Sequence, residues 1–236
     1  MERFEQTMPA ADRPKRRLPY VGVMLFASLL LLVGAAVLMI WLPYHREQAA
    51  IVAIERVGGA VIVEDGGPAW LREQIGDERM EVFDKVWRVW LSGKQVAGIM
   101  PAVGGLTRPR ELYLDSTPLT DAEMENLSGM TNLKRLNLAR SKVSDAGLAH
   151  LRDMANLEWL FLDHTDVTGP GLQHLGGLTS LERLDLANTQ ITDAALEHLV
   201  GMTNLEQLWL YDTQVTKEGV EKLQNQLSRC QIHADN

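Results

Sequence analysis

Five in-register copies of a 24-residue unit constrain this chain more than any other feature. A leucine recurs every 24 residues, and a second leucine follows two positions later in each copy. The first series is Leu112, Leu136, Leu160, Leu184 and Leu208, and the second is Leu114, Leu138, Leu162, Leu186 and Leu210. A fixed period of this length predicts a solenoid, because one unit cannot bury its apolar face alone and must stack on its neighbours.

The order of residues within a unit predicts a strand, a turn and a short helix. The Leu-x-Leu pattern places both leucines on one face of a strand. A hydroxyl residue and a branched apolar residue follow, and apolar residues then recur at helical spacing. The predicted helix N-caps are Thr120, Ser144, Thr168, Thr192 and Thr216. Thr120 and Glu123 have the spacing of a capping box.

These units resemble the leucine-rich repeat family, in particular its short bacterial type with a T-D-x-G-L-x-x-L second half. The resemblance covers about Trp87 to Ala234. It implies an α/β solenoid that forms a right-handed arc with a parallel inner sheet and outer helices. It also implies a scaffold for protein recognition.

An uncharged run over residues 21–42 predicts a transmembrane helix. As a helix these 22 residues span ~33 Å, which matches a hydrocarbon core of ~30 Å. The alternative is a cleaved signal peptide, but its apolar region is usually ~7–15 residues long and ends at a small-x-small cleavage site. The flank LPYHREQ offers no such site. With the repeats, this run makes the chain similar to membrane-anchored bacterial leucine-rich repeat proteins.

The distribution of charge predicts the topology. Residues 1–44 carry a net charge of +2, which leaves −10 for residues 45–236 out of a whole-chain charge of −8. The basic residues before the run place the N-terminus in the cytoplasm and the repeats outside the cytoplasmic (inner) membrane, as a single-pass protein. An acidic body excludes nucleic acid as the expected partner, because phosphates require a basic surface.

The predicted domains follow in chain order. A cytoplasmic basic tail (1–20) and the transmembrane helix (21–42) precede a juxtamembrane α/β cap (45–86). The leucine-rich repeat domain (87–236) follows. It comprises a degenerate repeat (87–108), five regular repeats (109–228) and a C-terminal cap strand (229–236). The cap is expected to contain a helix that ends at Gly58 or Gly59, the strand AVIVE and a second helix, AWLREQIGD.

The candidate binding residues are those that strand alternation turns away from the leucine core, on the concave face. They are the aromatic residues Tyr113, Trp159, Phe161, Trp209 and Tyr211, with the acidic residues Asp163, Asp185 and Asp212. With strands ~4.8 Å apart, three of the rings lie in one column at ~10 Å intervals. Aromatic anchors among charges favour a protein partner, and the carboxylates favour a basic one. The rings also suit sugars. The alternatives are that the rings merely pack against each other across the strands, and that the carboxylates belong to a solvated charged face.

Other residues give little evidence of chemistry. His150, His174 and His198 stand 24 residues apart and invite a zinc site, but no carboxylate or cysteine completes a tetrahedral set. Copying of the repeat explains them better. Asp121, Asp145 and Asp193 are interpreted as first-turn acids favoured by the helix dipole. The lone Cys230 cannot form an internal disulfide.

The sequence therefore predicts a binding protein. It contains no G-x-S-x-G, H-E-x-x-H, phosphate loop or C-x-x-C, so neither an enzyme nor a cofactor is expected. The predicted function is a membrane-tethered module for protein–protein interaction through its concave face. The alternative is a structural envelope protein, or a glycan-binding module without a specific protein partner.

Overall fold

The structure is a computed structural model that describes residues 20–67, 69–76, 84–106 and 108–235. By their internal contacts the residues form two units, Met1–Trp41 and Leu42–Asn236. Each unit is described by itself. The predicted cytoplasmic tail lies almost entirely outside the described residues.

Helix α1 (Tyr20–Arg56) begins in the first unit and continues through Pro43 into the second. Large apolar side chains between Met24 and Leu42 are exposed. Among the described residues, no helix combines the length and the apolar character that crossing a bilayer requires. The transmembrane helix predicted for residues 21–42 is therefore not supported, and the apolar run forms the first part of a longer helix. The predicted topology and domain boundaries stay predictions.

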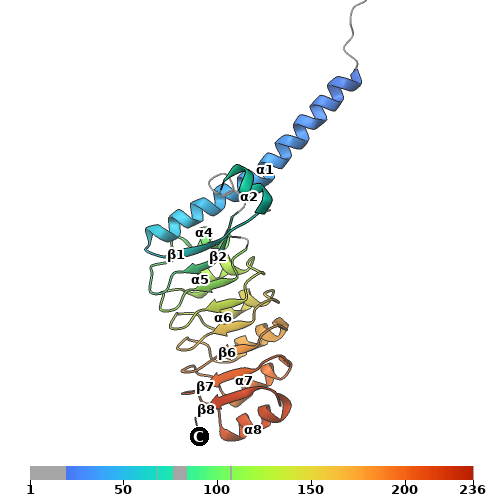
Figure 1. Cartoon of the computed structure of the whole chain (residues 1–236). Coiled ribbons are helices and arrows are strands. Elements are labelled where there is room, and N and C mark those ends of the chain that lie inside the picture. Colours follow the sequence, from blue (N-terminus) through green and yellow to red (C-terminus); the bar gives the residue numbers. More distant parts are fainter. Residues whose placement is uncertain (1–19, 68, 77–83, 107, 236) are drawn as a thin grey trace, which may run out of the picture. The chain divides into compact units, whose positions relative to one another are not determined.

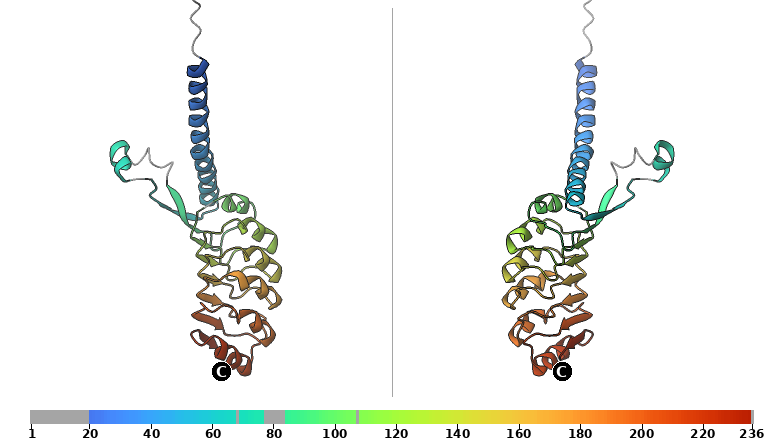
Figure 2. Two further views of the ribbon diagram at one scale, coloured as in Figure 1. Left: turned by 90° about the vertical axis from the view of Figure 1, so that its right-hand side faces the viewer. Right: turned by 90° about the vertical axis from the view of Figure 1, so that its left-hand side faces the viewer.

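The second unit contains one sheet, which in the described residues has eight strands in sequence order (Figure 1). Strand β1 pairs antiparallel with β2, and every later neighbour is parallel. The strands are β1 (Ala60–Glu64), β2 (Lys85–Trp90), β3 (Glu111–Tyr113), β4 (Arg135–Asn137), β5 (Trp159–Phe161), β6 (Arg183–Asp185), β7 (Gln207–Leu210) and β8 (Gln231–Ala234). The helical segments and turns that follow β2 to β7 lie on one side of the sheet (Figure 2). The predicted α/β solenoid with a parallel sheet is confirmed, while its right-handed winding stays a prediction.

The leucine positions pair with one another from strand to strand. Leu112, Leu136, Leu160, Leu184 and Leu208 are consecutive partners in the parallel ladder, and each is fully buried. Val89 pairs with Leu112 at one end and Ile232 with Leu208 at the other, as the degenerate repeat and the cap strand predict. One continuous apolar core therefore runs the length of the repeats.

Short helical segments return the chain from each strand to the next. They are α4 (Met100–Gly104), α5 (Asp121–Met124), η2 (Glu125–Leu127), α6 (Asp145–Leu148), η3 (Ala149–Leu151), η4 (Pro170–Gly177), α7 (Asp193–Leu196), η5 (Glu197–Leu199) and α8 (Lys217–Gln226), where η marks a 3-10 helix. Four of the five predicted N-caps are confirmed in position, at Thr120, Ser144, Thr192 and Thr216. The N-cap predicted at Thr168 is wrong, because η4 begins at Pro170 and the N-cap of η4 is therefore Gly169.

The predicted capping box is present at Thr120. The Glu123 carboxylate accepts the Thr120 backbone N–H at 2.9 Å and also its hydroxyl. These bonds, from the hydroxyl and then from the backbone, lower the pKa of Glu123.

The turn after the strand of each regular repeat contains a hydroxyl, which is buried in the first four repeats and half-buried at Thr213. In four repeats a threonine hydroxyl donates to the carbonyl of the second leucine at 2.5–2.7 Å, from Thr117, Thr165, Thr189 and Thr213. Ser141 occupies the same place, but its hydroxyl has no hydrogen-bond partner. The residue before each hydroxyl has a left-handed φ of 52–57°, and these residues are Ser116, Arg140, His164, Asn188 and Asp212.

The first-turn aspartates connect neighbouring repeats. Asp121 accepts the backbone N–H and the hydroxyl of Ser144, at 2.8 and 2.6 Å. Asp193 binds Thr216 in the same way, and Asp145 binds Thr168. The interpretation as helix-dipole acids is therefore incomplete, since these carboxylates also accept hydrogen bonds from the next repeat.

A glycine makes room for each of these aspartates. A Cβ on Gly147, Gly171 or Gly219 would overlap a carboxylate oxygen of the aspartate in the preceding repeat. Gly169 stands where three other repeats carry aspartate, and Ala195 stands in the glycine position of the repeat that follows. In these contacts between neighbouring repeats, an aspartate therefore faces a glycine three times, and a glycine faces an alanine once.

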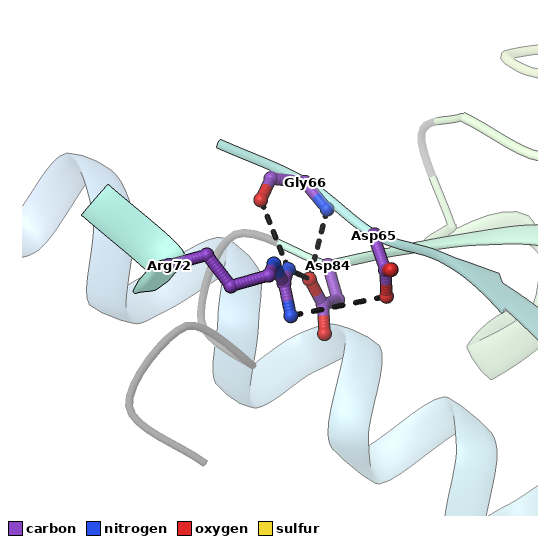
Figure 3. Close-up of polar contacts among 4 residues, drawn as sticks. All are labelled: Asp65, Gly66, Arg72 and Asp84. Carbon is purple, nitrogen blue, oxygen red and sulfur yellow. Dashed lines mark hydrogen bonds and ion pairs between the residues drawn. The ribbon is translucent and has the colours of Figure 1, made fainter. Parts of the chain in front are cut away.

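The cap before the repeats has the elements that the sequence predicts. Helix α1 ends at Arg56, before Gly58 with φ 77°, and AVIVE forms β1. The second predicted helix is α2 (Ala69–Ile75). Arg72 pairs with Asp84, approaches Asp65 at 3.8 Å and donates to the Gly66 carbonyl at 3.0 Å (Figure 3). These contacts fix the ends of the β1–β2 connection.

We predict that Asp145→Ala lowers the free energy of unfolding by about 1–3 kcal/mol, because the hydrogen bonds that its carboxylate accepts from Thr168 and Gly169 of the next repeat are lost. Burial raises the pKa of Asp145, but hydrogen bonds from Thr168, Gly169 and Gly171 outweigh it, and the pKa is lowered. The contribution is therefore present above the unfolded pKa and is lost as pH falls through the folded pKa. Urea unfolding at a series of pH values measures it. Exposed Asp153→Ala is the control, and equal losses would contradict the assignment.

Gly171→Ala is expected to cost about 1–3 kcal/mol, because its Cβ would lie 2.6 Å from the Asp145 backbone, which cannot move aside easily. Gly176→Ala is the matched control in the same 3-10 helix, since its Cβ would meet open space. Thermal unfolding of the two variants gives the comparison. Similar melting temperatures would show that close packing between repeats does not require this glycine.

Candidate functional site

The candidate site is the side of the sheet away from the helices, which we call the open sheet face. Side chains between the leucines project there, because neighbouring strand residues point to opposite sides. The parallel register aligns these side chains in columns that run from strand to strand. We name the columns A, B and C, in the direction of the strands.

Column A begins each strand and is rich in arginine. Its members are Arg88, Glu111, Arg135, Trp159, Arg183, Gln207 and Gln231. The Glu111 carboxylate is buried and pairs with Arg88 and, at 3.1 Å, with Arg135. Arg183 has no ion pair within the described part of the chain.

Trp159 lies between two guanidinium groups. Arg135 from β4 places its Cζ 3.7 Å from the centre of the indole ring, and Arg183 from β6 does so at 4.2 Å. Because these strands flank β5 on either side, the two cations cover the two faces of the ring. Each such contact is worth roughly 0.5–2 kcal/mol. Trp159 is therefore a rigid, partly buried part of the surface and offers no open ring face to a ligand.

Column B lies two residues further along each strand and contains most of the rings. Its members are Trp90, Tyr113, Asn137, Phe161, Asp185, Trp209 and His233. The predicted alignment of Tyr113, Phe161 and Trp209 in one column is confirmed by this register. Trp90 stacks on Tyr113 with centroids 5.9 Å apart, and Trp209 stacks on His233 at 5.5 Å.

Column C follows the strands and is acidic. Its members are Asp115, Ala139, Asp163, Ala187, Tyr211 and Asp235. Tyr211 is 41% exposed and approaches the His233 ring at 6.4 Å. Asp212 lies outside the columns, in the left-handed turn, where its N–H donates to the Asp235 carboxylate at 2.6 Å. In the earlier repeats the N–H at this turn position donates to the next repeat. At Asp212 the Asp235 carboxylate is the acceptor instead.

Asp185 and Asp163 influence one another. Burial raises the pKa of Asp185, the N–H of Ala187 at 3.0 Å lowers it, and the charge of Asp163 raises it again. The result is a raised pKa. Neither carboxylate has an ion pair in the portion that the structure describes.

Sequence reasoning missed five residues of this surface. Trp90 and His233 belong to the degenerate repeat and to the cap strand, and alternation from Val89 and Ile232 would have found them. Glu111, Arg135 and Arg183 directly precede the first leucine of their units, so alternation turns them outward too, but their contacts with other units leave no signal in the sequence. Of the eight candidates, Trp159 is covered and Asp212 lies apart, whereas the other six lie in columns B and C.

The histidines do not form a metal site. His150, His174 and His198 lie in η3, η4 and η5, on the helix side of the solenoid. The described residues contain no group of three or more His, Cys, Asp or Glu side chains that could hold a metal ion. Burial raises the pKa of the Cys230 thiol to about 11. These side chains therefore offer no evident reactive centre.

Comparisons with known proteins identify the repeats. Residues 109–167 match the family model "Leucine rich repeat", and residues 179–225 match "Leucine Rich repeats (2 copies)". No match among curated proteins is found. Leucine-rich repeats generally serve interaction and not catalysis.

Several solved structures are similar. Internalin C2 from Listeria monocytogenes is 23% identical, with a TM-score of 0.47, over 57% of this chain and 65% of that one. A leucine-rich repeat protein of Leptospira interrogans is 24% identical, with a TM-score of 0.48, over 56% and 33%. Pollen Receptor Kinase 3 is 18% identical, with a TM-score of 0.47, over 64% and 73%. This chain thus spans less than two thirds of the first two structures.

Glu111→Gln is expected to lower the free energy of unfolding by about 2–3 kcal/mol. The change leaves two arginines without their shared carboxylate, and their partial exposure moderates the loss. Glu158→Gln is the control, because its partner Lys134 is more exposed and the pair is worth about 0–1 kcal/mol. Denaturant titration of both variants decides the matter. Equal effects would contradict a structural role for column A.

Proposed function

Since the repeat matches and the parallel ladder support a leucine-rich repeat protein, we propose that this chain is a recognition module that binds a protein partner on its open sheet face. The single observation that carries the proposal is column B. Five rings stand in one register-aligned row on the side of the sheet opposite the helical segments that follow β2 to β7. Desolvated rings supply most of the binding energy at protein interfaces.

The geometry favours a protein over a glycan. Sugars stack on open ring faces, but the two faces of Trp159 are covered by Arg135 and Arg183. Tyr113 and Trp209 each lend one face to a neighbouring ring. What stays accessible is a row of ring edges and half-buried surfaces among charges, which suits the side chains of a protein. The proposed anchors are Trp90, Tyr113, Phe161, Trp209 and Tyr211.

The stacked pairs also favour tight binding. A ring held between neighbours loses little conformational freedom when a partner covers it, so less of the contact energy is offset by entropy. The charges of columns A and C would then decide which partner is accepted.

We predict that the double variant Phe161→Ala/Trp209→Ala retains the fold and loses its partner. Full-length wild type and variant are used as bait for an extract of the source cells, and retained proteins are quantified by mass spectrometry. Two hot-spot rings are worth at least about 2 kcal/mol, so retention should fall roughly thirtyfold or more.

The matched control is Gln173→Ala/Glu221→Ala, which removes two exposed side chains on the helix side. It should retain the same proteins as wild type. Equal retention by all three baits, or no specific retention by wild type, would contradict the proposal.

A further inference from the structure

The charges at the middle of the open sheet face are separated by sign. Arg183 lies in column A beside Trp159, and its guanidinium forms no ion pair among the described residues. Asp163 and Asp185 lie further along the same two strands and their turns, and they too form no ion pair among these residues. Arg183 and Asp163 therefore stand on opposite sides of Phe161 along the strands, and Asp185 lies beside Phe161 in column B.

These unpaired charges are confined to the middle of the face. Arg88 and Arg135 share Glu111. At the acidic side, Asp115 accepts the Ser92 hydroxyl at 2.5 Å, and Asp235 accepts the N–H of Asp212. Among the described residues, Arg183 and Asp163 near Phe161 thus carry charges that no ion pair engages, and Asp185 beside them accepts the N–H of Ala187 but forms no ion pair.

Phe161 supplies the apolar contact between them. Its ring is half-buried and its register neighbours in column B are Asn137 and Asp185, so no stacked ring covers it. Residues two apart on a strand are separated by ~7 Å, which puts columns A and C ~13 Å apart. An extended peptide laid along the strands repeats the same spacing with every second side chain.

We propose that this face recognises an extended peptide segment of the partner in which an acidic, an apolar and a basic side chain alternate with other residues. The acid binds Arg183, the apolar side chain packs on Phe161, and the base binds Asp163 and Asp185. The inference rests on the proposed function and adds the chemistry of the partner. It differs from the basic partner expected from the carboxylates alone, because Arg183 would repel a uniformly basic segment.

The test is selection of a displayed library of random linear peptides on the full-length chain. Wild type should enrich peptides with the acid-x-apolar-x-base order. Arg183→Gln should remove the preference for the acid, and Asp163→Asn/Asp185→Asn should remove that for the base. Each change should weaken an enriched peptide roughly tenfold, which corresponds to about 1.4 kcal/mol. Circular dichroism of each variant verifies the fold, and Arg183→Lys, which keeps the charge, should keep the acidic preference.

The remaining outcomes separate this inference from the proposed function. Enriched peptides that depend on Phe161 and Trp209 but show no such charge order would overturn the inference and leave the proposed function standing. Enrichment of uniformly basic peptides would do the same. If wild type enriches nothing, or if binding survives Phe161→Ala/Trp209→Ala unchanged, both fail.

Discussion

The in-register stacking of leucines is the constraint on which the rest of this structure depends. Each parallel strand within the regular repeats is very short, too short to define a register by hydrogen bonds alone. Leucines at equivalent positions of neighbouring repeats bury completely when they face one another, and a slip by a single position would turn them to solvent. The same register necessarily aligns the side chains on the opposite side of the sheet. Columns A, B and C are therefore a consequence of the core, and any recognition surface on this face inherits its spacing from the leucines.

A second set of bonds fixes the helix side, where the segments are too short to be stable by themselves. Asp121, Asp145 and Asp193 supply acceptors to the next repeat, and a glycine of that next repeat admits each of them. Neither residue type is explained within its own repeat. The carboxylate of the aspartate binds outside its own helix, and the glycine weakens the helix that contains it. Both make sense only as halves of one contact between neighbours. In the one repeat with Gly169, both halves change together, because Ala195 fills the space that a carboxylate would occupy.

The sequence predicted the features that follow from period and alternation. It predicted the strands, the buried leucine slots, the end positions at Val89 and Ile232, and the column of Tyr113, Phe161 and Trp209. It did not predict features that depend on contacts between repeats. The guanidinium groups on Trp159 come from long side chains of two other units, and the role of Asp145 depends on Thr168 in the following repeat. Thr168 failed as an N-cap because the following Gly-Pro pair moved the helix start. The run at 21–42 was interpreted by its composition alone, whereas the helix that contains it extends to Arg56.

The stacked rings and the charges without an ion pair lie in different regions of the open sheet face, as far as the described residues show. At its two ends, Trp90 with Tyr113 and Trp209 with His233 form rigid pairs. The conformational entropy of these rings is therefore lost on folding and not on binding. At its middle, Trp159 holds Arg183 in place by stacking without neutralising its charge. A guanidinium fixed in this way keeps its hydrogen-bond donors available while losing little entropy on binding. Arginine is better suited to this position than lysine, whose ammonium would lie as a point charge without a planar face for the indole. Arg183 is thus held with its hydrogen-bond donors directed outward, and the carboxylates of Asp163 beyond Phe161 and of Asp185 beside it carry the opposite charge.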